Sequence, residues 1–298
     1  MSAPALPPRA AWTDLLDRAL AEDLGRAGDL TSQATVDDGA SARARLVARA
    51  PGVVAGLPLV AEVFARLDGR VLFESAVRDG ERVAAGALLA EIGGPARALL
   101  AGERVALNLL GRLSGIATAT RELVDLVAGT GAGIADTRKT TPTLRALEKY
   151  AVRCGGGRNH RFGLDDAILV KDNHIAAVGS VGEAIRRARA FAGHLVKVEA
   201  EIQRLEQLDE AIAAGADVVM LDNFELEAIR QAVRRAAGRV VLEASGGVTR
   251  ATVRAIAEAG VDLVSVGWIT HSAPALDVAL DFEVRGASPP RHRIASDD

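Results

Sequence analysis

Hydrophobic and polar positions follow two different patterns along the chain. Between about residues 42 and 92 the apolar residues form short strand-like runs, and Asp79-Gly80 is typical of a hairpin turn between two of them. From residue 133 onward, short apolar runs alternate with stretches of helical periodicity. The first pattern predicts short strands joined by tight turns, and the second predicts repeated β–α units.

The strands predicted in the second part are almost wholly apolar, which is typical of parallel strands covered by helices. They are residues 133–136, 167–171, 195–202, 217–223, 239–245 and 262–267, with helices at about 180–191, 203–214, 224–237 and 249–259. Six strands are fewer than the eight of a complete barrel, and an open doubly wound sheet also fits the pattern. Because polar residues follow all six strands rather than one switch point, we favour an incomplete α/β barrel of about six to seven strands.

Two further helices are predicted before the barrel. Residues 12–24 have an apolar face, and residues 97–128 read as mostly helical with a break near Ser114-Gly115. Arg104 lies on the second of these helices beside Glu103, and an ordinary surface pair is the simplest interpretation of the two residues.

Composition narrows the class of protein. The chain has 298 residues, of which 49% are hydrophobic, and a net charge of -3. Its overall electrostatic field therefore does not favour binding to nucleic acid or to an anionic membrane. Cys154 is the only cysteine, which excludes an intrachain disulfide and suggests a reducing compartment. We find no secretory signal at the first residues and no apolar run long enough to span a membrane. We therefore expect a soluble, cytoplasmic protein.

Basic residues are concentrated around the first two barrel strands. They follow a strand end or lie in a glycine-rich loop, where side chains can converge on one point: Arg138, Lys139, His160, Arg161 and Lys171. A solvated basic face is the usual explanation of a charge run. Here the cations follow apolar strands, so we favour a pocket for a small ligand with several negative charges.

Acidic residues lie on the next two strands. Lys197, Glu199 and Glu201 share one face of the third strand by its period of two, and Asp222 ends the fourth. Glu201 and Asp222 together are suited to a hydrated Mg²⁺ that also contacts phosphate oxygens. A structural ion-pair cluster that includes Lys197 is the alternative.

Glycine turns follow the last two strands. Ser245-Gly246-Gly247 precedes a helix predicted near residue 249, and Gly267 precedes residues 269–272. Backbone N–H groups exposed at helix starts bind phosphate, and barrel enzymes often bind phosphate in these loops. A cationic pocket, an acidic metal pair and a phosphate turn together suit a phosphoribosyl donor. Its transfer passes through an oxocarbenium-like state, which an enzyme stabilises by positioning and electrostatics.

Several long motifs closely resemble the quinolinate phosphoribosyltransferases. They are ERVALNLLGRLSGIAT (103–118), ADTRKTTP (135–142), LEKYAVRCGGGRNHR (147–161), LDDAILVKDNHI (164–175), LDN (221–223), EASGG (243–247) and VGWITHS (266–272). The resemblance implies an N-terminal α/β hammerhead-like sandwich domain over residues 1–115 and a barrel domain over residues 116–274. It also implies that residues 275–298 pack back on the first domain.

The resemblance implies conversion of quinolinate and phosphoribosyl diphosphate to nicotinate mononucleotide, CO₂ and diphosphate, with Mg²⁺. By position, it implies that Arg138, Lys139, His160, Arg161 and Lys171 bind the quinolinate carboxylates, and that Glu201 and Asp222 serve the metal and ribose. Ser245, Gly246, Gly247 and Gly267 match the phosphate turns, and Lys139, Lys171, Glu201 and Asp222 form the implied catalytic group. Arg104 matches an arginine supplied by a neighbouring subunit, so a homodimer is implied, with a higher oligomer of dimers left open.

The chain departs from the family pattern at Thr143, where glycine is usual, at Phe162, and at Trp268, which replaces a small residue beside a phosphate turn. Other functions remain to be weighed. A phosphoribosyltransferase for nicotinate would need fewer cations, and a Schiff-base lyase would use Lys171 as its nucleophile. A non-enzymatic anion-binding module leaves Glu201 and Asp222 without a role.

Overall fold

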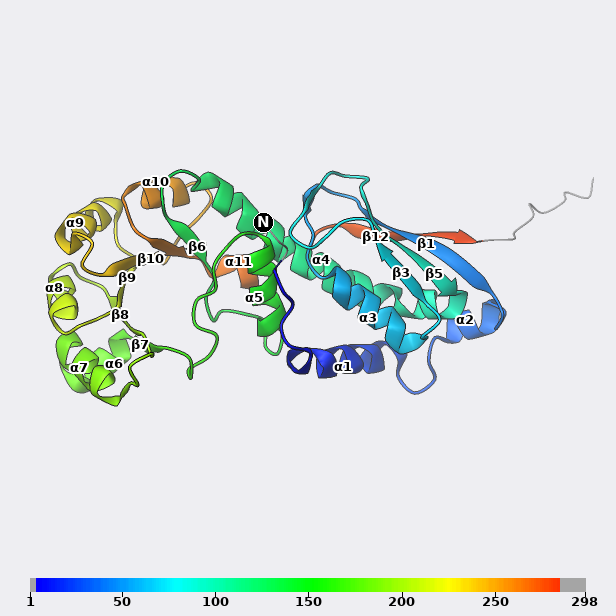
Figure 1. The fold of residues 1–298 in the computed structure, drawn as a ribbon, viewed down its shortest axis with the longest axis horizontal. Coiled ribbons are helices and arrows are strands. Elements are labelled where there is room, and N and C mark those ends of the chain that lie inside the picture. Colours follow the sequence, from blue (N-terminus) through cyan, green and yellow to red (C-terminus); the bar gives the residue numbers. More distant parts are fainter. Residues whose placement is uncertain (1–3, 285–298) are drawn as a thin grey trace, which may run out of the picture.

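The computed structural model describes residues 4–284, which form an antiparallel sheet region and a parallel sheet region (Figure 1). The antiparallel sheet has the order β12-β1-β5-β3, and β2 pairs with β4 in a two-stranded ribbon. Their bounds are β1 Ser41–Ala48, β2 Gly52–Val53, β3 Leu72–Ser75, β4 Arg82–Val83, β5 Leu88–Pro95 and β12 Val278–Val284. The helices of this region are η1 Arg9–Ala11, α1 Thr13–Leu24, α2 Leu30–Thr35 and α3 Leu57–Leu67.

The parallel sheet has the order β6-β11-β10-β9-β8-β7. Its strands are β6 Gly133–Ala135, β7 Ile168–Val170, β8 Val198–Ile202, β9 Val218–Asp222, β10 Val241–Ser245 and β11 Leu263–Ser265. Its helices are α5 Arg145–Cys154, α6 Asp172–Val178, α7 Val181–Phe191, α8 Glu206–Ala213, α9 Leu226–Ala236, α10 Val253–Glu258 and α11 Trp268–His271. Each strand from β8 to β11 lies beside its predecessor in the sequence.

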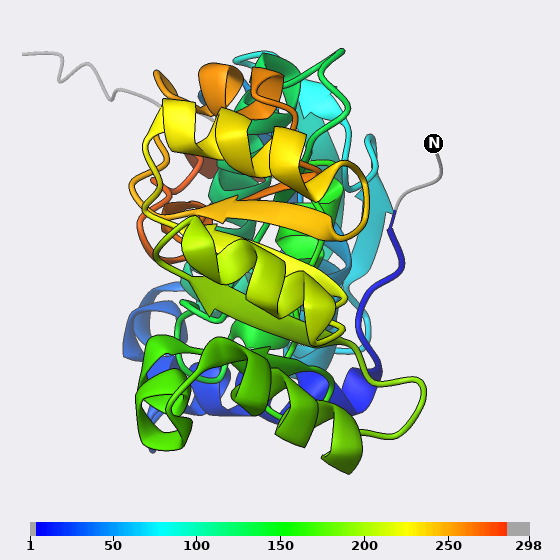
Figure 2. The same ribbon diagram turned by 90° about the vertical axis from the view of Figure 1, so that its left-hand side faces the viewer.

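This strand order confirms the incomplete barrel, since a doubly wound sheet would reverse direction at a switch point. Helices α7, α8 and α9 lie along the outside of the strands (Figure 2). Within residues 4–284 no ladder joins the edge strands β6 and β7. Instead, the loop after α5 forms a parallel bridge from Arg158 to Ala135, with Arg158 N donating to Ile134 O at 2.7 Å. The loop that carries His160 and Arg161 is thereby held at the open edge.

Helix α4, Ala96–Leu126, is continuous, so the predicted break near Ser114-Gly115 is wrong. Both residues are buried, because the helix packs closely on other segments at this point. The Ser114 hydroxyl accepts a hydrogen bond from Ala55 N at 3.0 Å, and a side chain at Gly115 would overlap the carbonyl oxygen of Pro274. Small residues here permit close contact between segments rather than a bend.

The hairpin predicted at Asp79-Gly80 is also wrong, because β3 pairs with β5 and β4 pairs with β2. Asp79 is buried instead, and its carboxylate accepts hydrogen bonds from the first backbone N–H groups of α3, at Gly56 (2.6 Å) and Leu57 (3.1 Å). The hydroxyl of Tyr150 donates to the same carboxylate at 2.6 Å. Asp79 therefore caps a helix and connects it to α5 in the barrel region.

The chain returns to its N-terminal region after the barrel. β12 pairs antiparallel with β1 over seven residue pairs, from Ala42 opposite Val284 to Ala48 opposite Val278. Residues 285–298, which belong to the segment expected to pack back, lie outside the described residues.

Candidate active site

A cavity of about 350 Å³ opens at the carboxyl ends of the barrel strands. Inward-facing residues of successive strands and the loops that follow them form its wall: Thr137, Arg138, Lys139, His160, Arg161, Leu169, Lys171, Glu201, Met220, Asp222, Ser245 and Ser265. The cavity thus brings together eight of the twelve residues predicted from the sequence. A larger hollow over the N-terminal sheet, lined by residues such as Arg45 and Glu91, contains none of them.

Two guanidinium groups, those of Arg138 and Arg161, lie together in the cavity and form no ion pair with a carboxylate of residues 4–284. Burial lowers the pKa of Arg161, and the neighbouring charge of Arg138 lowers it further. In the described part of the chain, the Nε atoms of both arginines are buried and have no hydrogen-bond partner. Buried donors of one sign that repel each other are costly unless an anion satisfies them. This part of the cavity is therefore suited to a small polyanion.

Lys139 packs across one of the two glycine turns, the one at Gly267. A Cβ atom added to Gly267 would lie 2.9 Å from Cδ of Lys139, so the absence of a side chain at Gly267 leaves room for the lysine. The backbone carbonyl of Lys139 accepts a hydrogen bond from Thr270 Oγ1 at 2.8 Å. The basic loop after β6 and the turn after β11 are therefore fixed to each other.

On the opposite wall, Lys171 and Glu201 form an ion pair of 2.5 Å. Glu201, the last but one residue of β8, is largely buried, whereas the Lys171 side chain is 45% exposed. Asp222 lines the same cavity from β9, the neighbouring strand. Two carboxylates on adjacent strands, both open to one cavity, provide the oxygen ligands that Mg²⁺ prefers.

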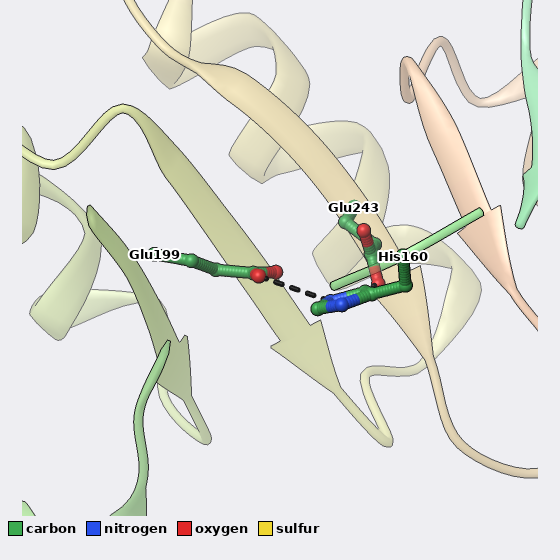
Figure 3. A group of neighbouring side chains, drawn as sticks. All are labelled: His160, Glu199 and Glu243. Atoms are coloured by element: carbon green, nitrogen blue, oxygen red, sulfur yellow. Dashed lines mark ion pairs between the residues drawn. The ribbon is translucent and has the colours of Figure 1, made fainter. Parts of the chain in front are cut away.

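The half-buried His160 forms a cluster with two buried carboxylates, Glu199 and Glu243 (Figure 3). His160 Nε2 lies 3.0 Å from Glu199 and 3.7 Å from Glu243, while its Nδ1 accepts from Arg161 N at 2.7 Å. Burial opposes a charge on His160, but the hydrogen bond and charge of Glu199 outweigh it and raise the pKa of His160. Burial and the neighbouring Glu199 raise the pKa of Glu243 to about 7. In this geometry both ring nitrogens of His160 are engaged within the protein.

A second buried network holds the basic loops. The carboxylate of Asp136, fully buried at the end of β6, accepts from Lys149 Nζ, from His160 N at 2.8 Å and from Asn159 Nδ2 at 2.6 Å. Burial raises the pKa of Asp136 and lowers the pKa of Lys149, so the pair depends on these hydrogen bonds. The network fixes the segment that carries Arg138 and Lys139 against the segment that carries His160 and Arg161.

A third interaction supports the first basic loop from below. Arg112 of α4 forms an ion pair of 2.8 Å with the fully buried Glu148 of α5. The same guanidinium donates to the carbonyl oxygen of Thr270, and Glu148 Oε2 accepts from Thr141 N at 3.0 Å. Arg112 and Glu148 were not predicted as functional residues, although both lie within motifs that resemble the family, at 103–118 and 147–161.

The turn after β10 has the backbone geometry that its glycines suggest. Gly246 and Gly247 have φ angles of 94° and 60°, which L side chains rarely adopt. Thr143, where the family usually has glycine, has a φ of 68° and is therefore strained as a β-branched residue. Phe162 is 49% exposed, and its backbone N–H donates to Asp166 at 2.6 Å.

Two of the charged residues singled out in the sequence lie away from this cavity. Arg104 is exposed and lines a separate groove of about 240 Å³ beside α1, so it does not reach the cavity of its own chain. Lys197 precedes β8 at the opposite end of the barrel and forms an ion pair of 2.9 Å with Asp217. The proposed ion-pair cluster of Lys197 with Glu201 is therefore wrong, because the lysine lies before the strand begins and faces solvent.

An α/β barrel with a basic cavity at the carboxyl ends of its strands, next to two carboxylates and two glycine turns, defines an enzyme class that acts on small anionic substrates. Comparison with known proteins gives the family. Residues 116–281 match the quinolinate phosphoribosyl transferase C-terminal domain, and residues 29–114 match the N-terminal domain of the same family. The chain belongs to the quinolinate phosphoribosyl transferase family.

Individual relatives agree with this assignment. The chain is 49% identical over 274 residues to the probable nicotinate-nucleotide pyrophosphorylase [carboxylating] of Bacillus subtilis, covering 92% of this chain and 94% of the relative. It is also 49% identical over 277 residues to the nicotinate-nucleotide pyrophosphorylase [carboxylating] of Mycobacterium leprae, covering 90% and 96%. The crystal structure of NadC from Streptococcus pyogenes matches with a TM-score of 0.91 and 44% identity, covering 94% of this chain and 99% of that one.

Proposed function

We propose that this protein converts quinolinate and phosphoribosyl diphosphate to nicotinate mononucleotide, CO₂ and diphosphate, a step of NAD biosynthesis. The observation that carries the proposal is the adjacent pair of half-buried residues Arg138 and Arg161. Their Nε atoms are buried without a hydrogen-bond partner, and their guanidinium groups form no ion pair among the described residues. Quinolinate has two neighbouring carboxylates and satisfies both arginines. The names of the relatives are consistent with this reaction.

The residues of the cavity divide between the two substrates. Arg138, Arg161 and Lys139 bind the acid on the side of β6, and the turns at Gly246-Gly247 and Gly267 bind the phosphate of the donor. Lys171, beside Glu201, lies where it can neutralise charge on the departing diphosphate. Catalysis then consists of holding the acceptor nitrogen against the ribose carbon and stabilising the leaving group.

We further propose that Glu201 and Asp222 hold Mg²⁺. Their carboxylates fit a hard cation and both face the cavity. When bound, the ion would neutralise charge on the diphosphate oxygens. The two carboxylates themselves orient the ribose by accepting hydrogen bonds from its hydroxyl groups.

We also infer a homodimer in which Arg104 enters the partner's cavity. Its position in a groove apart from its own cavity supports this arrangement. A cytoplasmic location is consistent with the single buried cysteine. In the described part of the chain, no helix combines the length and apolar character needed to cross a bilayer.

The Schiff-base alternative is less well supported. An amine that attacks a carbonyl must be free to approach it, whereas Lys171 Nζ is engaged in an ion pair of 2.5 Å with the Glu201 carboxylate. Borohydride trapping with carbonyl substrates tests that alternative directly. For nicotinate as acceptor, one of the two arginines would be left without a partner.

The decisive experiment incubates purified protein with quinolinate carrying ¹⁴C in its 2-carboxylate, phosphoribosyl diphosphate and Mg²⁺. We expect release of ¹⁴CO₂ and formation of nicotinate mononucleotide in equal amounts, and loss of both with EDTA. Nicotinate offered in place of quinolinate is the matched control, and we expect a far lower specificity constant for it. Comparable constants for the two acids, or no turnover, would contradict the proposal.

A further inference from the structure

Trp268 connects the two glycine turns at the mouth of the barrel. It is the first residue of α11, directly after Gly267, and its indole Nε1–H donates to the backbone carbonyl of Val248 at 3.0 Å. Val248 directly follows Gly246-Gly247, the turn after β10. One side chain therefore fixes the turn of one strand to the turn of the next.

The indole ring is itself held in place from the other side. The guanidinium of Arg250 lies 4.6 Å from the ring centroid, in a cation–π geometry. Arg250 in turn forms an ion pair of 2.7 Å with Glu122 of α4. The half-buried ring also packs against the hydrophobic core. Trp268 therefore has one defined orientation, with its donor aimed at the turn.

The turn needs such support. Gly246 and Gly247 both have positive φ, so this backbone has many accessible conformations when it is not held by neighbours. A phosphate bound by backbone N–H groups gains most when those groups are already oriented, because less conformational freedom is then lost on binding. On the other side of Gly267 lies the stem of Lys139, so movement of this residue would also displace a basic side chain.

We propose that Trp268 is a positioning residue for the phosphate of the ribose donor. It does not line the cavity, and it acts by fixing the turn at Gly246-Gly247 relative to the turn at Gly267. The inference rests on the proposed phosphoribosyl transfer. It also gives a role to a residue that departs from the family pattern.

The test uses the fact that the chain has two tryptophans. Trp12→Phe leaves Trp268 as the single indole, and this variant serves as the parent for fluorescence only. Trp268→Phe in the otherwise unaltered chain keeps an aromatic ring beneath Arg250 but removes the N–H donor. We expect the KM for phosphoribosyl diphosphate to rise about three- to tenfold, as for the loss of one hydrogen bond, with the KM for quinolinate changed less than twofold.

Fluorescence of the Trp12→Phe parent provides the second measurement. Addition of inorganic phosphate should shift or quench the emission of Trp268 in a saturable way, whereas quinolinate alone should have a much smaller effect. Equal changes in the two KM values, or emission that does not respond to phosphate, would overturn the proposal. If the Trp12→Phe variant binds phosphate with this signal but does not turn over the two substrates, the proposed reaction fails, and Trp268 positions the turn for the phosphate of a different substrate.

A second variant tests the proposal in case Trp268→Phe does not fold. Arg250→Gln removes the stacked cation but keeps the indole and its N–H group. We expect the same selective rise in the KM for phosphoribosyl diphosphate, of smaller size than in Trp268→Phe. If Trp268→Phe does not fold and Arg250→Gln leaves both KM values unaltered, the proposal is wrong.

Discussion

The charged residues of the cavity were predicted because each one follows an apolar strand. Arg138, Lys171 and Asp222 lie where the period-two pattern of a strand ends, and the carboxyl ends of parallel strands meet at one edge. The residues beneath them carry no such signal. Glu148 and Lys149 lie within a helix, where a charged residue ordinarily faces solvent, and only the tertiary structure buries them.

The buried pair of Lys149 and Asp136 gives a prediction for stability. Lys149→Met leaves the Asp136 carboxylate without its counter-ion, and we expect a loss of about 3–5 kcal/mol in the free energy of unfolding. The matched control is Lys197→Met, which removes a lysine whose side chain is 73% exposed and should cost less than about 1 kcal/mol. Urea denaturation of both variants at neutral pH measures the difference. Equal losses would show that burial of the pair has no energetic consequence.

Glu243 gives a prediction for pH dependence. Its folded-state pKa is raised to about 7, so the folded protein keeps a proton that the unfolded chain releases at lower pH. The resulting stability is complete at low pH, is lost as pH rises towards 7, and stays lost above it. Glu243→Gln imitates the protonated acid, so at pH 8 we expect it to be more stable than the parent by on the order of 1–3 kcal/mol.

At pH 4 the advantage of Glu243→Gln should disappear. Glu74→Gln, at an exposed strand position, is the control and should show no such pH-dependent gain. Chemical denaturation across this pH range measures both. A constant difference between Glu243→Gln and the parent would contradict a raised pKa.

At the scale of elements, strands and helices of the barrel were predicted well because each unit buries its own apolar face. The errors lie where small or turn-forming residues serve contacts between distant segments. Gly115 allows the carbonyl of Pro274 to approach α4, and Asp79 caps α3 instead of forming a hairpin. Local sequence cannot distinguish these uses, since a glycine or an aspartate suits a turn equally well.

The turn after β10 offers a comparison of two adjacent glycines. A Cβ at Gly246 would overlap the side chain of Asn223, next to Asp222, whereas a Cβ at Gly247 would meet no atom within 4 Å. We expect Gly246→Ala to lower kcat/KM for phosphoribosyl diphosphate at least about tenfold, which corresponds to about 1.4 kcal/mol. Gly247→Ala adds only backbone strain and should have a clearly smaller effect. Steady-state kinetics measure kcat/KM for both variants. An equal loss of kcat/KM in the two would mean that the contact with Asn223 has no effect.

At the scale of the whole molecule, the presence of two kinds of sheet followed from the change in hydrophobic pattern between residues 92 and 133. The continuity of α4 across both regions did not, because its small residues resemble a break. How chains assemble is likewise invisible to periodicity. For Arg104, the structure of one chain shows only that the residue lies outside the cavity of that chain.

The shared-site hypothesis gives a complementation test. Arg104→Ala and Lys171→Ala homodimers should each be nearly inactive. When the two are refolded together, about half of the dimers are mixed, and each mixed dimer has one intact site, so activity should return to roughly a quarter of the parent value. Co-refolding of each variant with itself is the control. If mass spectrometry shows subunit exchange and no activity returns, Arg104 does not act in the partner's cavity.

The pairing of β12 with β1 has a consequence for biosynthesis. β1 lies inside its sheet only because residues 278–284 lie beside it, and the ribosome makes these residues after the whole barrel. During translation, the backbone N–H and C=O groups on one edge of β1 therefore stay unpaired until β12 has been made. Such an open strand edge favours aggregation. A transcript cut short before residue 278 would encode every residue lining the cavity and still yield a nascent chain with this open edge. For such a product, we expect chaperone binding and inclusion bodies rather than a smaller active enzyme.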